Sequence, residues 1–380
     1  MRLIFWQSSL SLLNSSYIGA LAGRPGWGVT VIAERRMKPE REALGWMVPD
    51  FGQARLVIAS ENPEALALEQ YPEDAIHVVE GMRGFSLVRR VLPLLSKRSA
   101  HVGVVFESGD ASGLKGGLRR ILYTWQGLAH SSGIDFFLAM GSQGVGWYRK
   151  CLFPNSKIYR FGYVTAPADG HRPEPMQLPE SMQRATTDKV TVGFLGSLIP
   201  RKGGDLLIRA LAGLTDRNWR LVIVGDGGSR SSWEQLAVQE RIADNVTFTG
   251  VLPNAEAKAI LGHLDLFVLP SRFDGWGAVV NEALMQGVPA VCSDRCGARD
   301  LLSDSWRGEA FEAGSMEGLR EVLRTWIGRG KRTPELTERI KTWSRCIEGA
   351  SVADYFAQVL GHVYHGAPRP TVPWLSDTSS

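Results

Sequence analysis

Short apolar runs alternate with longer amphipathic segments throughout the first half of the chain. Aliphatic and β-branched runs of this length, bounded by turn residues, are typical of buried parallel strands separated by helices. The pattern predicts strands at residues 2–6, 29–33, 55–58, 76–79, 102–106 and 136–139. Helices are expected at residues 12–21 and 114–129, and the second would carry Leu118, Ile121, Leu122 and Trp125 on one side. The first half is therefore predicted to be an α/β domain with a doubly wound parallel sheet.

The same pattern restarts after a proline-rich polar stretch. Residues 168–188 contain few side chains that could pack in a core, which favours an interdomain linker. Strands are then expected at residues 190–196, 220–225, 246–250, 265–270 and 288–292, each followed by a helical segment. We predict two Rossmann-like domains, at residues 1–167 and 189–349. A C-terminal helix at about residues 350–365 is expected to pack back on the first domain, and residues 366–380 are expected to form a poorly ordered tail.

Size and composition agree with two domains and exclude several other classes. The chain has 380 residues, whereas single hydrophobic cores stop growing near about 250–300 residues. Its 43 basic and 39 acidic residues give a net charge of +4, too small to indicate nucleic-acid binding. Four scattered cysteines do not make a disulfide framework, and no uninterrupted apolar run reaches about 18 residues. We expect a protein of the reduced cytoplasm with no membrane-spanning segment.

The segment from Leu269 to Leu284 carries the strongest chemical signal. A strand is predicted to end at Pro270, a glycine-containing loop follows, and a helix begins near Ala278. The free N–H groups and the positive dipole end of such a helix favour an anion such as a diphosphate. Asp274 in the loop and Glu282 in the helix are suited to accept hydrogen bonds from vicinal sugar hydroxyls.

A second strand-to-helix junction lies between Val192 and Gly204. A glycine turn there is followed by the adjacent cations Arg201 and Lys202, which suit a diphosphate. Taken alone, two acids or two cations at a helix start more often belong to a solvated surface. Two phosphate-seeking junctions in one domain make a binding site the stronger hypothesis.

Five ordered segments resemble the landmarks of the family-4 retaining glycosyltransferases, which are of the "glycosyl transferases group 1" type. These segments are Phe194–Gly203, Val222–Gly227, Asn245–Gly250, Leu269–Ser271 and Asp274–Gly287. The resemblance covers about residues 190–302 and implies the GT-B fold, in which two Rossmann-like domains face each other across a cleft. It implies a nucleotide-diphospho-sugar donor on the second domain and a saccharide or lipid-linked saccharide acceptor on the first, with a role in cell-surface polysaccharide synthesis.

The resemblance also assigns residues to the donor. Glu282 would hold the ribose hydroxyls, Asp274 would hold those of the transferred sugar, and Lys202 and Arg201 would neutralise the diphosphate. The backbone N–H groups expected to bind the β-phosphate are those of Gly277, Ala278 and Val279. The remaining residues expected to hold the nucleotide are Gly196, Ser197, Gly225, Asp226 and Val251.

Two residues depart from the family pattern. Family members usually carry Glu where this chain has Asp274, so the acid is one methylene shorter. Many have a phosphate-binding Arg where this chain has Ser197, and Arg201 could compensate for it.

We expect the transfer to be independent of metal ions and of any cofactor. No DxD-like motif stands at a strand end, and Cys292 with Cys296 is a weak metal signal that favours packing. The resemblance implies retention of anomeric configuration through front-face attack. Glu107 follows a predicted strand and is preferred to Asp110 as the base or positioning residue of the first domain. A solvent-facing acid at a strand end is an equally weighted alternative for Glu107.

Other interpretations stay open at this point. A nucleotide-sugar epimerase would need further acid–base residues, and a non-catalytic sugar-nucleotide binding protein would share the same fold. A dinucleotide-dependent oxidoreductase is disfavoured because no complete G-x-G-x-x-G motif precedes a helix. The basic, apolar segments 114–125 and 86–98 suit an anionic membrane surface, although a core-facing helix with a solvated basic edge is preferred for each.

Overall fold

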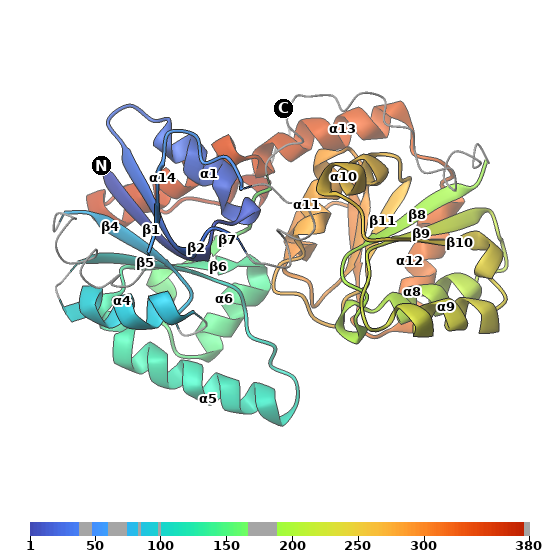
Figure 1. Cartoon of the computed structure of the whole chain (residues 1–380), viewed down its shortest axis with the longest axis horizontal. Coiled ribbons are helices and arrows are strands. Elements are labelled where there is room, and N and C mark those ends of the chain that lie inside the picture. The colour runs from blue at the N-terminus through green and yellow to red at the C-terminus, as the bar shows by residue number, and fades with distance from the viewer. Residues whose placement is uncertain (38–47, 60–73, 83–84, 98–99, 166–187, 376–380) are drawn as a thin grey trace. The chain divides into compact units, whose positions relative to one another are not determined.

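A computed structural model describes residues 1–37, 48–59, 74–82, 85–97, 100–165 and 188–375. The chain divides into two units (Figure 1). The first consists of Met1–Ala166 and Cys346–Ser380, and the second of Pro167–Arg345. The predicted linker, apart from Asp188, lies outside the described residues.

The first unit is built on a seven-stranded parallel sheet with the order β3-β2-β1-β4-β5-β6-β7. Its strands are β1 (Arg2–Ser9), β2 (Gly28–Arg35), β3 (Arg55–Ile58), β4 (Ile76–Glu80), β5 (His101–Phe106), β6 (Phe136–Met140) and β7 (Ile158–Phe161). Its helices are α1 (Leu12–Ala22), α4 (Ser86–Lys97), α5 (Gly113–His130), α6 (Gly141–Lys150) and α14 (Gly349–His365). The strand order reverses direction between β1 and β4, as in a doubly wound fold.

The second unit repeats this architecture with a six-stranded parallel sheet of order β10-β9-β8-β11-β12-β13. Its strands are β8 (Val190–Leu195), β9 (Trp219–Val224), β10 (Val246–Gly250), β11 (Leu266–Leu269), β12 (Ala290–Ser293) and β13 (Gly308–Phe311). Its helices are α8 (Gly204–Ala212), α9 (Arg230–Gln239), α10 (Asn254–Gly262), α11 (Ala278–Met285), α12 (Met316–Gly328) and α13 (Pro334–Ser344). Two parallel Rossmann-like sheets confirm the predicted fold class.

Strands β7 and β13 were not predicted from the pattern. Both are four-residue strands at a sheet edge, and polar residues interrupt their apolar character, Arg160 in β7 and Glu309 in β13. An edge strand is covered less completely than a central one, so its sequence needs no continuous apolar run.

The C-terminal helix α14 completes the core of the first unit, although it follows the second unit in sequence. It packs beside α1 (Figure 1). The Phe356 ring is fully buried within 6.5 Å of four other aromatic rings. Those rings belong to Phe5, Tyr17, Phe136 and Phe161. The helix is therefore part of the first unit's core.

The segment after α14 differs from the expected poorly ordered tail over residues 366–375. The Arg369 guanidinium donates hydrogen bonds to the carbonyls of Ser156 and Ile158 and lies 4.3 Å from the centre of the Tyr159 ring. Trp374 is buried. A cation stacked on an aromatic ring and a buried indole hold this segment, in spite of its proline-rich composition.

The two basic, apolar segments of the first unit both form helices, but their apolar sides face in opposite directions, one towards the core and one towards solvent. Helix α4 buries its large side chains, so the core-facing interpretation is right for it. Helix α5 does the reverse, because Leu118, Ile121 and Trp125 are all exposed, and the core-facing interpretation is wrong for it. Across the described part of the chain, every helix is too short or too polar to cross a bilayer.

We predict that Phe356→Ala lowers the free energy of unfolding of the first unit by about 3–5 kcal/mol, because it leaves a cavity among four rings. Hydrogen–deuterium exchange should accelerate in peptides from β1 and α1 and stay unchanged in peptides from β8. The control is Gln358→Ala, which alters an exposed residue on the same helix. Equal exchange in the Phe356 and Gln358 variants would contradict a core role for α14.

Candidate active site

The loop between β11 and α11 requires glycine at its last position. Gly277 has a φ of 92°, and a Cβ there would lie 2.5 Å from the Cys296 sulfur and 2.8 Å from Leu269 Cδ2. Helix α11 begins at the next residue without a side-chain hydrogen bond to cap it. The first N–H groups of a helix have no acceptor within the helix, so those of Ala278 and Val279 form a site of positive potential.

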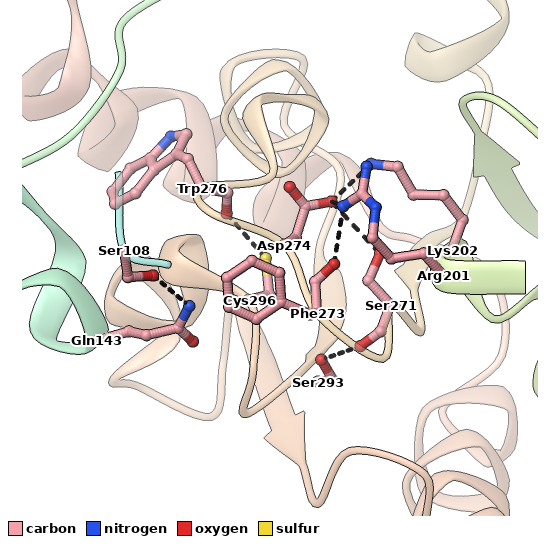
Figure 2. Close-up of polar contacts among 10 residues, drawn as sticks. All are labelled: Ser108, Gln143, Arg201, Lys202, Ser271, Phe273, Asp274, Trp276, Ser293 and Cys296. Carbon is pink, nitrogen blue, oxygen red and sulfur yellow. Dashed lines mark hydrogen bonds and ion pairs between the residues drawn. The ribbon is translucent and has the colours of Figure 1, made fainter. Parts of the chain in front are cut away.

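Asp274 in this loop is buried and is paired with the two predicted cations (Figure 2). Lys202 Nζ lies 2.5 Å from Asp274 Oδ2, and Arg201 Nη1 lies 3.9 Å from the same oxygen. The Ser271 hydroxyl donates to that oxygen over 3.4 Å. The predicted sugar-binding acid and the predicted phosphate-binding lysine therefore form one ion pair.

The turn that carries the cations is fixed against the end of β11. Gly203 has a φ of 71°, and a Cβ on it would lie 2.1 Å from the Pro270 carbonyl oxygen. Arg201 donates to the Phe273 carbonyl over 2.8 Å, and Arg272 N–H donates to the Arg201 carbonyl over 2.8 Å. These contacts join the β8–α8 turn to the β11–α11 loop, so the charges of both segments are held together.

Arg272 and Asp205 form a second ion pair between the same two segments, which sequence reasoning missed. The Arg272 guanidinium donates two hydrogen bonds to the Asp205 carboxylate, over 2.9 and 2.7 Å. Burial raises the pKa of Asp205, but hydrogen bonding and charge from Arg272 outweigh it and hold the pKa below its ordinary value. An arginine in one loop and an acid 67 residues earlier, in the first turn of α8, were a weak signal, because only the fold brings the two together.

The buried thiol of Cys296 packs against the loop between β11 and α11. It donates to the Trp276 carbonyl over 2.9 Å, and the Cys296 backbone lies beside that of Asp274 as an isolated parallel bridge. Burial raises the pKa of this thiol, which keeps it protonated as a donor. No cluster of three or more metal-ligating side chains occurs among the described residues, and Cys292 and Cys296 are free cysteines. Their contacts favour a packing role.

Glu282 lies one turn into α11 and is half-buried. Burial raises the pKa of this carboxyl group above its ordinary value, and the charge of Lys258 only partly opposes the shift. The neighbouring Asn281 is held by the Trp276 indole, which donates to it over 2.8 Å. Desolvating a carboxylate costs free energy, and hydrogen bonds from the hydroxyl groups of a ligand would offset that cost.

The residues expected to hold the nucleotide lie at the carboxyl ends of β8, β9 and β10, next to β11 in the sheet. Gly225 N–H donates to the Gly250 carbonyl over 2.8 Å, and Gly196 N–H donates to the Val224 carbonyl over 3.0 Å. Of the remaining three, Ser197 and Val251 are exposed, and Asp226 pairs with Arg230 at 3.0 Å. The Gly227 N–H, followed by Arg230, lowers the pKa of Asp226. All five residues therefore lie at the carboxyl ends of strands in the same sheet.

In the first unit, Glu107 follows β5 and is not a free surface acid. The Tyr163 hydroxyl is hydrogen bonded to it, and burial followed by the charges of Glu107 and Glu80 raises the pKa of Tyr163. Asp110 instead accepts hydrogen bonds from Ser112 in the exposed turn before α5.

Sequence reasoning missed Glu80 in the first unit. The backbone N–H and the hydroxyl of Ser8 donate to Glu80 over 3.1 and 3.2 Å, which ties the ends of β1 and β4 together. Glu80 is the last residue of β4, and Glu107 directly follows β5. An acid at the end of a strand was the signal that selected Glu107, and the same signal could have found Glu80.

Comparisons with known proteins show what the second unit is similar to. Residues 180–343 match the family described as "Glycosyl transferases group 1". The alpha-D-kanosaminyltransferase of Streptomyces kanamyceticus is 29% identical over 195 residues, which are 50% of each chain. A GDP-mannose-dependent alpha-(1-6)-phosphatidylinositol monomannoside mannosyltransferase of Mycobacterium tuberculosis H37Rv is 32% identical over 165 residues, which are 41% of this chain and 43% of that one. The chain therefore spans about half the length of these curated relatives, or less.

Solved structures match nearly the whole chain in fold. HepE of Anabaena, crystallised in complex with UDP, has a TM-score of 0.69 at 15% identity and covers 95% of this chain and 100% of its own. Sucrose-phosphate synthase of Thermosynechococcus elongatus also has a TM-score of 0.69 at 15% identity, with coverages of 97% and 100%. The fold is the GT-B fold, and residues 180–343 are similar to the glycosyl transferases group 1 family.

We predict that Glu282→Gln stabilises the protein at neutral pH when no donor is bound. Glu282 has a raised pKa in the folded state, so its favourable contribution is present below the unfolded pKa of about 4.3 and is lost as the pH rises through the folded pKa. The melting temperature of the variant should therefore exceed that of the wild type near pH 7.5, and the difference should shrink towards pH 4.

Glu335→Gln is a control of opposite sign for this experiment. The backbone N–H of Glu335 itself, followed by the Thr333 hydroxyl, lowers the pKa of Glu335 at the start of α13, so its contribution is present at neutral pH and lost in acid. This variant should be less stable than the wild type near pH 7.5. A Glu282 variant that matches the wild type at both pH values would contradict the burial of a charge at this position.

Proposed function

We propose that the protein transfers a glycosyl group from a nucleotide-diphospho-sugar bound to the second unit. The observation that carries this proposal is the Lys202–Asp274 pair beside the start of α11, because one cation, one acid and free helix N–H groups meet there. The name of the mannosyltransferase relative specifies a GDP-mannose donor, and HepE was crystallised with UDP. Both support a nucleotide-sugar donor for this chain.

Donor binding would exchange the partners of the ion pair. The diphosphate would take Lys202 and Arg201 together with the N–H groups of Gly277, Ala278 and Val279. Asp274 would then be released to accept hydrogen bonds from hydroxyls of the transferred sugar, and Glu282 from those of the ribose. The ligand-free ion pair keeps each charge neutralised until a donor supplies better partners.

The reaction would form a bond between an acceptor oxygen and the anomeric carbon and break the bond from that carbon to the diphosphate. Negative charge develops on the leaving diphosphate, where Lys202, Arg201 and the α11 N–H groups would stabilise it. We propose front-face attack with retention, in which the acceptor proton passes to the leaving phosphate oxygen. Glu107, with Tyr163 as its partner, would position the acceptor hydroxyl on the first unit.

The acceptor proposed is a saccharide or lipid-linked saccharide, with a role in cell-surface polysaccharide synthesis. The name of the mannosyltransferase relative specifies a glycosylated phosphatidylinositol, which supports an acceptor of this kind. A sugar-nucleotide epimerase would convert the donor without any acceptor, so the requirement for an acceptor separates the two activities.

We expect Lys202→Met to lower kcat for transfer about 10²–10³-fold, because it removes a charge that acts on the leaving group. The assay would measure acceptor-dependent release of nucleotide from a panel of UDP- and GDP-sugars. Lys341→Met, which breaks an exposed pair with Glu338, is the matched control and should keep wild-type rates. Lys202→Met should also lower the melting temperature, because it leaves the buried Asp274 carboxylate without its nearest cation. The double variant Lys202→Met with Asp274→Asn should recover that melting temperature but not the activity. Wild-type turnover in Lys202→Met would overturn the proposal.

We also expect transfer to survive EDTA and the product to keep the anomeric configuration of the donor. The charges needed at the diphosphate are supplied by side chains and helix N–H groups, so a chelator should change kcat/KM less than about twofold. The ¹H coupling constant of the anomeric proton in the first-formed product reports the configuration. Activity that EDTA abolishes and Mg²⁺ or Mn²⁺ restores would contradict metal independence, and an inverted product would contradict front-face attack.

A further inference from the structure

Helix α5 presents its largest apolar side chains to solvent. Leu114, Leu118, Ile121, Trp125 and Leu128 are 61–95% exposed. Their spacing of three and four residues places them in one stripe along the helix. Large side chains in an unbroken exposed stripe mark an interaction surface, whereas single exposed apolar residues do not.

The opposite face of α5 explains why the helix cannot turn this stripe inward. Gly116, Tyr123 and Gly127 form the side that packs on the first unit. A Cβ on Gly127 would lie 2.9 Å from the Cys151 carbonyl oxygen and 2.9 Å from the Phe153 ring, and the Tyr123 ring lies 5.4 Å from that of Phe106. The contact therefore requires small residues at Gly116 and Gly127, and a leucine or tryptophan would not fit at either position.

The charge of α5 decides between the occupants that could cover this stripe. The helix carries Lys115, Arg119 and Arg120 and contains no aspartate or glutamate. A second copy packed about a two-fold axis through α5 would bring these cations against one another. An anionic lipid surface can bind both the apolar stripe and the cations of α5. Trp and Leu side chains enter the membrane interface, while Lys and Arg side chains stay at the headgroups.

We propose that α5 docks the protein on an anionic lipid bilayer, with the stripe from Leu114 to Leu128 inserted at the headgroup boundary. The helix lies in the plane of the membrane, which fits a chain in which no described helix could span it. Because this interaction needs no sugar donor, its test is independent of the proposed transfer reaction.

The test is cosedimentation of the full chain with vesicles of phosphatidylglycerol and phosphatidylcholine in equal parts, compared with phosphatidylcholine alone. The wild type should bind the mixed vesicles, and added salt should weaken the binding. Leu118→Glu with Trp125→Glu should lower the partition coefficient more than about tenfold, since it removes two inserted groups and adds repulsion. Lys115→Gln with Arg120→Gln should lower it about fivefold for each cation removed.

Val238→Glu on α9 is the matched control, because Val238 is 64% exposed, as is Trp125, but lies in the second unit. It should bind vesicles like the wild type. Every variant should keep the wild-type melting temperature, which shows that loss of binding is not loss of folding. Brominated lipids should quench tryptophan fluorescence in the wild type more than in Trp125→Phe.

Three results would overturn the proposal. The first is a wild-type protein that does not sediment with the mixed vesicles, and the second is a Leu118/Trp125 variant that binds them as well as the wild type. The third is a wild-type dimer in sedimentation equilibrium that the Leu118/Trp125 variant dissociates, in the absence of vesicle binding. That third result would assign the stripe to another copy of the chain.

Discussion

The ion pair between Lys202 and Asp274 joins two turns that lie 72 residues apart in sequence. Around it, Gly203 packs against the Pro270 carbonyl, Arg201 donates to Phe273, and Arg272 pairs with Asp205. All of these contacts connect the β8–α8 turn with the β11–α11 loop. The positive start of α11 and the two cations can act on one anion only because these segments are held together.

One carboxyl group of the second unit's site, that of Glu282, is held at a cost to the stability of the protein. Glu282 keeps a carboxyl group in surroundings that raise its pKa, and Gly277 adopts a φ that other residues avoid. The thiol of Cys296 supports the same loop at a depth that keeps it neutral. In the proposed complex, hydroxyl groups of the donor would offset the cost of desolvating the Glu282 carboxyl group, whereas glycine adopts the φ of Gly277 without strain.

Helix α5 shows the same trade-off between stability and interaction on a larger scale. An ordinary surface helix buries its leucines and exposes its small and polar residues, as α4 does. In α5, Gly116 and Gly127 face the protein, whereas the leucines, Ile121 and Trp125 are exposed. The helix gives up the stabilisation that burial of these side chains would supply, which is the physical argument for a partner outside the unit.

The sequence alone determined most of the fold and the types of residue at the site. Uninterrupted apolar runs predict central parallel strands because those strands are buried on both faces, and the edge strands β7 and β13 were missed because they lack such runs. Only the tertiary structure decided which charges are partners, because the pairs Lys202 with Asp274 and Arg272 with Asp205 depend on strand order and not on sequence spacing. It also decided which way α5 faces, because periodicity defines an apolar stripe but cannot state which side of a helix meets the core.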